Sequence, residues 1–301
     1  MNRPVFEGSA VAIVTPFDEG GVNFKKLEKL VDFHLQNKTD AIVVCGSTGE
    51  ASTMPDSEHL DTIKCVVDAV NGRVPVIAGT GSNDTQHGIR LTSNAVKLGA
   101  DAVLLVTPYY NKCTSEGLYR HYKALSDNCD APIILYNVPS RTNVNIGPEL
   151  LYRLADIENI VGVKECNLTQ VPNILSLCGD RFDIYSGEDG LVLPLLSLGG
   201  KGVISVVANI LPELMHDMVH SYINGDQAKA RKAQVDIIPL VKALFCEVNP
   251  IPVKEALDIL GVNPGPCRLP LCEMTKANHD LMKEVLSKYD TSALTSFFKE
   301  A

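Results

Sequence analysis

Eight short runs of mostly β-branched and aliphatic residues recur along the 301-residue chain, and their spacing limits the folds it can adopt. The runs are 9–14, 41–45, 74–78, 102–106, 132–136, 160–164, 182–186 and 202–206, so successive runs begin 32, 33, 28, 30, 28, 22 and 20 residues apart. Each run is continuously apolar rather than alternating, which is typical of parallel strands buried on both faces.

The segments between the runs carry helical periodicity, as in 24–36 and 58–70, where Asp56 or Ser57 is the expected N-cap of the second helix. Eight consecutive strand–helix units predict an α/β fold, the (β/α)8 TIM barrel. An open doubly wound sheet is the alternative, but it would need a topological switch point and usually has fewer strands.

After residue 230 the strand-like runs stop, and the segments 229–245, 249–261 and 277–289 each predict a helix. We therefore predict a barrel over residues 1–230 that carries the active site, and a C-terminal helical domain over residues 231–301.

Composition and charge exclude several classes of partner. The chain has 27 Lys+Arg against 36 Asp+Glu and a net charge of −9, without long basic clusters, so nucleic acid is not expected as a partner. No apolar run approaches the ~18 residues of a membrane span, and the first residues lack the layout of a signal peptide. The nine cysteines form no CxxC pair and are expected to be reduced thiols. We expect a cytoplasmic protein without membrane contact.

The residues just past each predicted strand should meet at one end of the barrel, where the active sites of such barrels lie. They are 15–16, 46–50, 79–83, 107–110, 136–141, 164–165, 186–189 and 205, and they supply hydroxyls, phenols, one arginine and one lysine. Lys164 ends the run IVGVK, and a lysine buried at a barrel mouth loses part of its preference for the ammonium form. An ordinary exposed lysine is the alternative.

This set of side chains suits Schiff-base chemistry. A free amine at Lys164 can attack a carbonyl group, and the loss of water that follows requires a group that shuttles protons. Tyr136, at the end of the preceding strand, is the natural candidate for that role. Arg141 is placed to bind a substrate carboxylate through its planar fork.

We expect no metal and no cofactor in this chemistry. A lysine imine itself serves as the electron sink, so pyridoxal phosphate is not required. His216 and His220 are four residues apart in LMHDMVH, a spacing that can hold a metal, but the sequence offers no third ligand in view. We therefore predict that these two histidines lie on a solvated helix face.

Several motifs resemble those of the dihydrodipicolinate synthase (4-hydroxy-tetrahydrodipicolinate synthase) family over essentially the whole chain. In order they are GSTGEAST, VTPYYNK, LYNVPSRT, VGVKEC, YSGEDG, GGKGVISVVAN, NPIPVK and RLPLCEM. The resemblance implies a class I aldolase-type lyase that condenses pyruvate with L-aspartate 4-semialdehyde in diaminopimelate and L-lysine biosynthesis. It also implies an oligomer, commonly a homotetramer built as a dimer of dimers.

The resemblance further assigns roles to individual residues. Lys164 matches the Schiff-base lysine and Tyr136 the proton donor and acceptor, while Ser47 and Tyr110 match the rest of a proton relay in which Tyr110 reaches into the partner's site. The substrate-binding positions that it implies are Thr48, Ile204, Arg141 and Gly187.

Two segments depart from the family's pattern. Most synthases have threonine where Ser47 stands, and GSTGE is associated with N-acetylneuraminate lyases, although NVPSRT around Arg141 resembles the synthases. The segment VKECNLTQ replaces a small-residue stretch that usually ends in glycine. An N-acetylneuraminate lyase, or another pyruvate-dependent sugar-acid aldolase, is therefore the nearest alternative, and a non-catalytic pyruvate-binding sensor barrel is an alternative of another class.

Some members of the family are inhibited by lysine. His59, Asn83 and Tyr109 match the inhibitor site, but Asp56 and His87 replace a histidine and a glutamate of the inhibited enzymes. Because that glutamate would bind the ammonium group of the inhibitor, we predict weak or absent lysine feedback.

Overall fold

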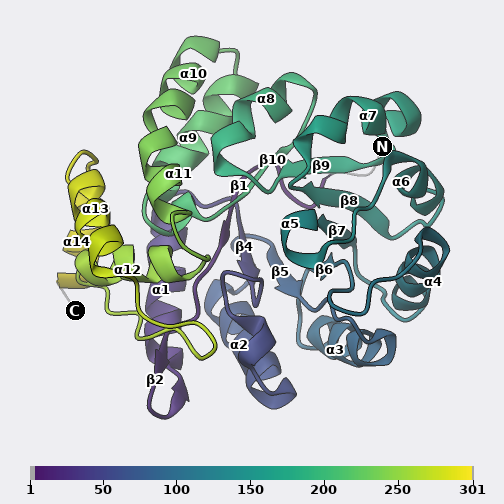
Figure 1. Cartoon of the computed structure of the whole chain (residues 1–301), viewed down its shortest axis with the longest axis horizontal. Helices are drawn as coiled ribbons and strands as arrows, with labels where there is room; N and C mark the ends of the chain where they lie inside the picture. Colours follow the sequence, from purple (N-terminus) through teal and green to yellow (C-terminus); the bar gives the residue numbers. More distant parts are fainter. Residues whose placement is uncertain (1–3, 300–301) are drawn as a thin grey trace.

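The barrel predicted from the eight apolar runs is confirmed by a computed structural model that describes residues 4–299 (Figure 1). Eight parallel strands close in the order β1-β10-β9-β8-β7-β6-β5-β4. The strands of the barrel are β1 (Gly8–Ala12), β4 (Ala41–Val44), β5 (Val76–Gly79), β6 (Ala102–Val106), β7 (Ile133–Asn137), β8 (Ile160–Glu165), β9 (Asp183–Ser186) and β10 (Gly202–Ser205).

A ring of helices covers the outside of the barrel (Figure 1). Its members are α1 (Phe24–Gln36), α2 (Asp56–Val70), α3 (Thr85–Lys97), α4 (Ser115–Ser126), α6 (Pro148–Leu154), α7 (Val171–Cys178), α8 (Val192–Ser197) and α9 (Pro212–Ile223), with a short α5 (Pro139–Thr142) directly after β7. The predicted helix 24–36 has the observed bounds. The expected cap of α2 is wrong, because Asp56 already lies in the first turn and Pro55 is the N-cap residue. A two-stranded hairpin, β2 (Phe17–Asp18) and β3 (Gly21–Val22), was not predicted.

The C-terminal extension is helical, as predicted, but its helices are shorter and more numerous than expected. They are α10 (Gln227–Asp236), α11 (Ile238–Leu244), α12 (Ile251–Ile259), α13 (Lys276–Leu286) and α14 (Ser292–Lys299). The single helix predicted over 229–245 is broken after α10, because Pro239 has no N–H to continue the helical hydrogen bonds. The predicted boundary at residue 230 falls inside α10, and the division into two domains stays a prediction.

Side chains fill the barrel and the space between strands and helices. A compact inner cluster includes Ala10, Val43, Ile134, Tyr136 and Ile204. Larger apolar clusters pack the outer faces of the strands against the helices. The extension joins this packing through α14, where the ring of Phe297 lies 5.5 Å from that of Phe33 on α1. Within residues 4–299, no helix combines the length and apolar character that a bilayer-spanning segment requires.

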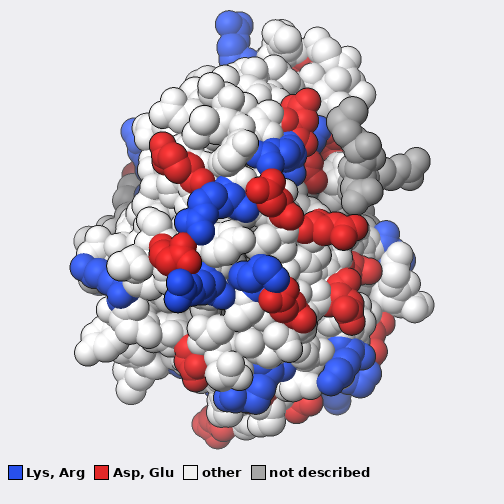
Figure 2. Space-filling model, turned by 90° about the vertical axis from the view of Figure 1, so that its right-hand side faces the viewer, with Lys and Arg blue, Asp and Glu red and all other residues white. Residues whose placement is uncertain are grey.

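The face on the right of Figure 1, which includes α4, α6 and α7, carries both signs of charge side by side (Figure 2). Glu116 on α4 forms ion pairs with Arg120 and Arg153, each at 2.9 Å. Arg181 and Asp156 form another pair at 2.9 Å. The net negative charge of the chain is therefore not gathered into a patch of one sign on this face.

Candidate active site

Lys164 and Tyr136 lie side by side at the ends of neighbouring strands. Strands β7 and β8 pair in parallel with Tyr136 opposite Lys164, and Lys164 Nζ lies 4.4 Å from the centroid of the tyrosine ring. Each residue is only 7% exposed. The register of two adjacent strands thus fixes the pair that the sequence analysis assigned to imine chemistry and proton transfer.

The surroundings of Lys164 favour its neutral amine. Burial lowers the pKa of Lys164, whereas the nearby acidic side chains of Asp189 and Glu188 oppose this shift and Arg141 adds to it. A lowered pKa leaves more of the lysine in the nucleophilic form at neutral pH.

The surroundings of Tyr136, in contrast, favour the protonated form of its phenol. Burial raises the pKa of Tyr136, while the positive charge of Arg141 and a side-chain hydrogen bond with Ser47 oppose the rise. Tyr136 is therefore held as a neutral phenol that can pass a proton between a bound molecule and the Ser47 hydroxyl.

A cavity of about 440 Å³ opens beside Tyr136, and Lys164 is not among the residues described as lining it. Ser47, Tyr136 and Arg141 are among the residues that line it, together with residues from β5, from β6, from the loop after β4 and from the C-terminal extension. The volume lies within the range of small-molecule sites in proteins. Three of the predicted site residues therefore present polar groups to this cavity: the hydroxyl of Ser47, the phenol of Tyr136 and the guanidinium of Arg141.

The C-terminal extension contributes directly to this site, which the sequence analysis did not anticipate. Asn249 donates from Nδ2 to Thr48 Oγ1 at 3.0 Å, and Arg141 Nη2 donates to the carbonyl oxygen of Asn249 at 3.1 Å. One residue thus fixes two of the predicted substrate-binding side chains. The motif NPIPVK contains Asn249, but nothing in the spacing of the motif indicates these contacts.

A buried ion pair supports the loop that holds Ser47 and Thr48. Lys254 on α12 donates from Nζ to Glu50 Oε1 at 2.8 Å, and the side chains of the two residues are 3% and 1% exposed. The backbone N–H of Arg268 donates to Glu50 Oε2 at 2.8 Å. Cys45 and Glu50, at the two ends of this loop, have φ values of 54° and 56°, a conformation that ordinary residues adopt at a cost. The surrounding contacts hold the loop in that shape.

Two further predicted positions lie around the pair formed by Tyr136 and Lys164. Ile204 is 1% exposed and packs in the inner cluster with Tyr136. A Cβ added to Gly187 would lie 2.3 Å from Cys166 Sγ and 3.3 Å from Lys164 Cε, so any larger residue at this position would displace the side chain of Cys166. Asp189 Oδ2 accepts the N–H groups of Val206 and Val207 at 2.9 and 3.1 Å and fixes the chain after β10.

Glu165 and the segment after it build a buried network behind the site. The carboxylate accepts hydrogen bonds from Asn137 Nδ2 at 2.8 Å, Gln170 Nε2 at 2.8 Å and Asn167 N at 2.6 Å. Burial raises the pKa of Glu165 to about 7, and these donors oppose the rise. Asn137 thus joins the end of β7 to Glu165 on β8. Asn167 and Gln170 belong to VKECNLTQ, so the segment that departs from the family's pattern supplies two further donors to the same carboxylate.

Tyr110 does not join the other predicted residues within this chain. Its side chain is 93% exposed, its φ is 69°, and it is absent from the described lining of the cavity, which Tyr109 does reach.

The structure brings the other predicted site residues to one end of the barrel: Lys164, Tyr136, Ser47, Thr48, Arg141, Gly187 and Ile204.

The prediction for His216 and His220 is wrong in one respect. Asp40, 176 residues from His216 in sequence, lies within 3.1 Å of both imidazoles, so a third candidate ligand exists. With side chains 21% and 32% exposed, the two histidines are not on a freely solvated face. The sequence could not show this, because only barrel closure brings Asp40 to α9.

Comparison with known proteins gives a consistent result over nearly the whole chain. The model of the dihydrodipicolinate synthetase family matches residues 5–289. The 4-hydroxy-tetrahydrodipicolinate synthase of Acetivibrio thermocellus is 53% identical over 96% of this chain and 99% of that protein. The synthase of Caldicellulosiruptor saccharolyticus is 55% identical over 95% of this chain and 98% of that protein.

A solved structure agrees with these relatives. The chloride-inhibited dihydrodipicolinate synthase of Acinetobacter baumannii, complexed with pyruvate, superposes with a TM-score of 0.91 at 44% identity and covers 94% of this chain and 98% of its own. The sequence motifs, the closed barrel and the full-length matches point the same way, and the chain belongs to the dihydrodipicolinate synthetase family.

Proposed function

We propose that this enzyme condenses pyruvate with L-aspartate 4-semialdehyde through an imine on Lys164 to give 4-hydroxy-tetrahydrodipicolinate. Its function is that of its curated relatives, a lyase of diaminopimelate and L-lysine biosynthesis. The observation that carries the proposed chemistry is the pairing of Lys164 with Tyr136 across β7 and β8, with Nζ buried 4.4 Å from the phenol ring.

Each step of the proposed reaction uses a group at this end of the barrel. The neutral amine of Lys164 attacks the pyruvate carbonyl carbon, and the carbinolamine loses water as Tyr136 transfers a proton. Loss of a methyl proton gives an enamine, whose carbon forms a bond to the aldehyde carbon of the semialdehyde. The C=O π bond of the aldehyde breaks in this step, and its oxygen takes up a proton to become the hydroxyl group of the product. The amine of that adduct attacks the imine carbon, closes the ring and releases Lys164.

Arg141 and Thr48 supply the binding contacts in this proposal. The guanidinium of Arg141 lines the cavity and suits a carboxylate of the semialdehyde. Thr48 suits a pyruvate oxygen, with Gly187 leaving room beside the lysine and Ile204 giving an apolar wall. These assignments require neither pyridoxal phosphate nor a metal in the reaction.

We further propose that Tyr110 completes the proton relay of a partner protomer in a homotetramer built as a dimer of dimers. The 93% exposure of Tyr110 and its position outside its own cavity support a role at a subunit interface. The cytoplasm, where the thiols stay reduced, is the proposed location.

The proposal is tested by borohydride reduction of the protein with and without pyruvate, followed by peptide mapping and mass spectrometry. A pyruvate-dependent adduct on the peptide that contains Lys164 is expected. Turnover of pyruvate with L-aspartate 4-semialdehyde, but not cleavage of N-acetylneuraminate, would then separate the synthase from the nearest alternative. An adduct without turnover would favour a pyruvate-binding sensor, and an adduct on another lysine would contradict the mechanism.

Replacing Tyr136 by phenylalanine should lower kcat by about 10²-fold, because the ring is retained while the proton-transfer group is lost. Pyruvate should still form an imine with Lys164, but more slowly. Rapid-mixing measurements of imine formation and steady-state turnover would check this. Tyr122→Phe is a suitable control, since Tyr122 is buried away from Lys164 and bonds the carbonyl oxygen of Leu105. Unchanged turnover in the Tyr136 variant would contradict its role.

The rate of imine formation should rise with pH through a midpoint below ~10.4, the ordinary pKa of lysine. The sign follows from the chemistry, because the ammonium form cannot attack and burial shifts the balance toward the amine. Borohydride trapping of pyruvate after short reaction times across a pH series would measure the midpoint. A midpoint at or above the ordinary value would show that the site does not activate the lysine.

Lysine should inhibit this enzyme weakly or not at all. The cavity does contain a carboxylate at Asp56, but Asp56 Oδ1 is bonded to His87 Nε2 at 2.8 Å, and His87 Nδ1 is bonded to Ser82 Oγ at 3.0 Å. Both side chains are thus already hydrogen-bonded. The acidic residue stands at position 56 and the histidine at position 87, whereas the inhibited enzymes have a histidine at the first of these positions and a glutamate at the second.

The double variant Asp56→His/His87→Glu restores that order. It should lower the lysine concentration for half-inhibition at least about tenfold, the effect of one charge-assisted hydrogen bond. Lysine titrations of turnover compare it with the unaltered enzyme. Inhibition of the unaltered enzyme at micromolar lysine would refute the prediction.

A further inference from the structure

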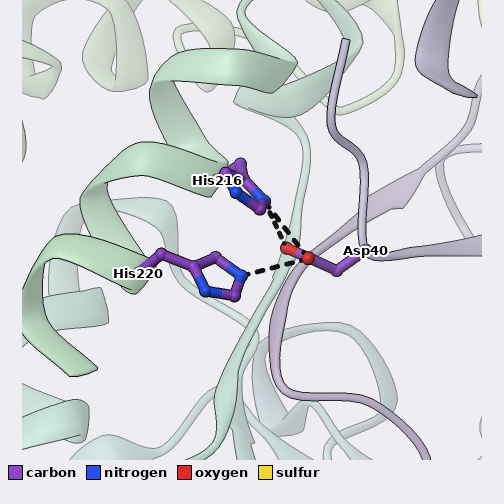
Figure 3. Close-up of side chains that lie close together, drawn as sticks. All are labelled: Asp40, His216 and His220. Atoms are coloured by element: carbon purple, nitrogen blue, oxygen red, sulfur yellow. Dashed lines mark hydrogen bonds and ion pairs between the residues drawn. The ribbon is translucent and has the colours of Figure 1, made fainter. Parts of the chain in front are cut away.

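Asp40, His216 and His220 form a compact cluster (Figure 3). The cluster lies where β4 begins, whereas Lys164 lies near the end of β8, at the opposite end of the barrel. Asp40 directly precedes β4, and the two histidines are one helical turn apart on α9. His216 Nδ1 lies 3.0 Å from Asp40 Oδ2, and His220 Nε2 lies 3.0 Å from Asp40 Oδ1. The imidazole rings are stacked, with centroids 4.0 Å apart and an interplanar angle of 28°.

We propose that these three residues bind a divalent transition-metal ion of the zinc class. Two imidazole nitrogens and one carboxylate oxygen are a ligand set that Zn²⁺ uses, and water can complete the coordination. In a tetrahedral site with metal–ligand bonds of ~2.0–2.2 Å, neighbouring ligand atoms are roughly 3.3–3.6 Å apart. The observed nitrogen–oxygen separations of 3.0–3.1 Å are close to this geometry, and the candidate ligand atoms all lie within 4.8 Å of one another.

The backbone of β1 orients the carboxylate. Ser9 N donates to Asp40 Oδ2 at 2.7 Å, and Asp40 N donates to Ser9 O at 3.0 Å. A Cβ at Gly8 would lie 2.1 Å from Asp40 Oδ2 and 2.9 Å from His220 Nε2, so glycine is what leaves room beside the cluster. Such outer contacts fix a ligand before the metal arrives.

The nearby lysine does not compete for this carboxylate. Lys38 pairs instead with Glu213 at 2.5 Å and Asp217 at 3.5 Å. One carboxylate and two imidazoles therefore face each other without a competing lysine, a donor set that suits a divalent cation. Side-chain exposures of 17–32% allow the ion and its water to enter.

Metal binding requires a change of tautomer in both rings. Without an ion, His216 Nδ1–H and His220 Nε2–H donate to Asp40. With the ion, those nitrogens present lone pairs, and each proton moves through solvent to the other nitrogen of its ring.

The consequence of binding is structural rather than catalytic. Strand β1 lies between β10 and β4 in the closed barrel, and α9 follows β10. An ion held by Asp40 and α9 therefore joins the segment that leads into β4 to the last unit of the barrel, across β1. Because it binds only the folded chain, it should raise the unfolding temperature.

The test is titration of the chelator-treated, dialysed full-length protein with Zn²⁺ by calorimetry, with thermal unfolding in parallel. We expect one equivalent per chain and a higher Tm with Zn²⁺. His216→Gln/His220→Gln should weaken binding more than ~100-fold, beyond the effect of losing an outer-shell contact, and should abolish the Tm response. If that variant does not fold, Asp40→Asn provides the same comparison.

Two controls separate this site from adventitious binding. His279→Gln alters a histidine on α13 that pairs with Glu255 outside the cluster and should bind Zn²⁺ as the unaltered chain does. Co²⁺ bound at the cluster should show visible ligand-field bands without the thiolate charge-transfer absorption that binding by cysteines would produce. Pyruvate adduct formation at Lys164 should be unchanged in every variant. No bound equivalent, equal binding by the double variant, or thiolate absorption would overturn the proposal.

Discussion

Replacing Lys164 by methionine should lower kcat by roughly 10⁴-fold or more, because the covalent nucleophile of the proposed reaction is lost. Methionine keeps the length and apolar character of the lysine stem, and it removes a buried amine whose pKa burial already lowers. The fold should therefore be retained. Steady-state kinetics should show the loss of turnover, and borohydride trapping should show the loss of the pyruvate adduct.

Lys201→Met is the matched control for this variant. Lys201 directly precedes β10, at the opposite end of the barrel from Lys164, and its backbone N–H bonds the carbonyl oxygen of Ile184. The control should keep full turnover and the pyruvate adduct. Appreciable turnover by Lys164→Met, or an adduct that persists in it, would show that another amine carries the chemistry.

Much of the fold and the centre of the candidate site could be predicted because the information is local in sequence. Continuous apolar runs define buried parallel strands, and residues just past such strands must meet at one end of a barrel. That rule alone brings Lys164, Tyr136 and Arg141 together. The break at Pro239 was missed because the apolar periodicity continues across it.

The contacts that could not be predicted join residues far apart in the chain. Asn249 reaches Thr48 across 201 residues, and Asp40 reaches His220 across 180. Periodicity describes which face of an element is buried but not which side chain of a distant element lies opposite. The position of Tyr110, exposed in its own chain, likewise depends on contacts beyond a single protomer in the proposed assembly.

Replacing Lys254 by methionine should lower the free energy of unfolding by about 3–5 kcal/mol, the cost of breaking a buried ion pair by removing one partner. The variant leaves the carboxylate of Glu50 buried without its cationic partner, although Glu50 still accepts from the N–H of Arg268. It also removes the bond from Lys254 to the carbonyl oxygen of Pro266. Denaturant unfolding of the variant and the unaltered chain measures the difference.

The same variant should lower kcat/KM, because Glu50 ends the loop that places Ser47 and Thr48 in the site. Lys242→Met, at an exposed position of α11, is the control and should change stability by less than about 0.5 kcal/mol.

The double variant Glu50→Gln/Lys254→Met identifies the cause of the loss. A neutral glutamine keeps the shape of Glu50 and can still accept from Arg268, so it removes the unpaired charge that the single variant leaves behind. The double variant should therefore be more stable than Lys254→Met alone, although its loop contacts and its kcat/KM need not recover. If both variants show the same decrease in the free energy of unfolding, the destabilisation comes from lost packing and from the lost bond to Pro266. The ion pair would then serve to hold the loop rather than to stabilise a buried charge.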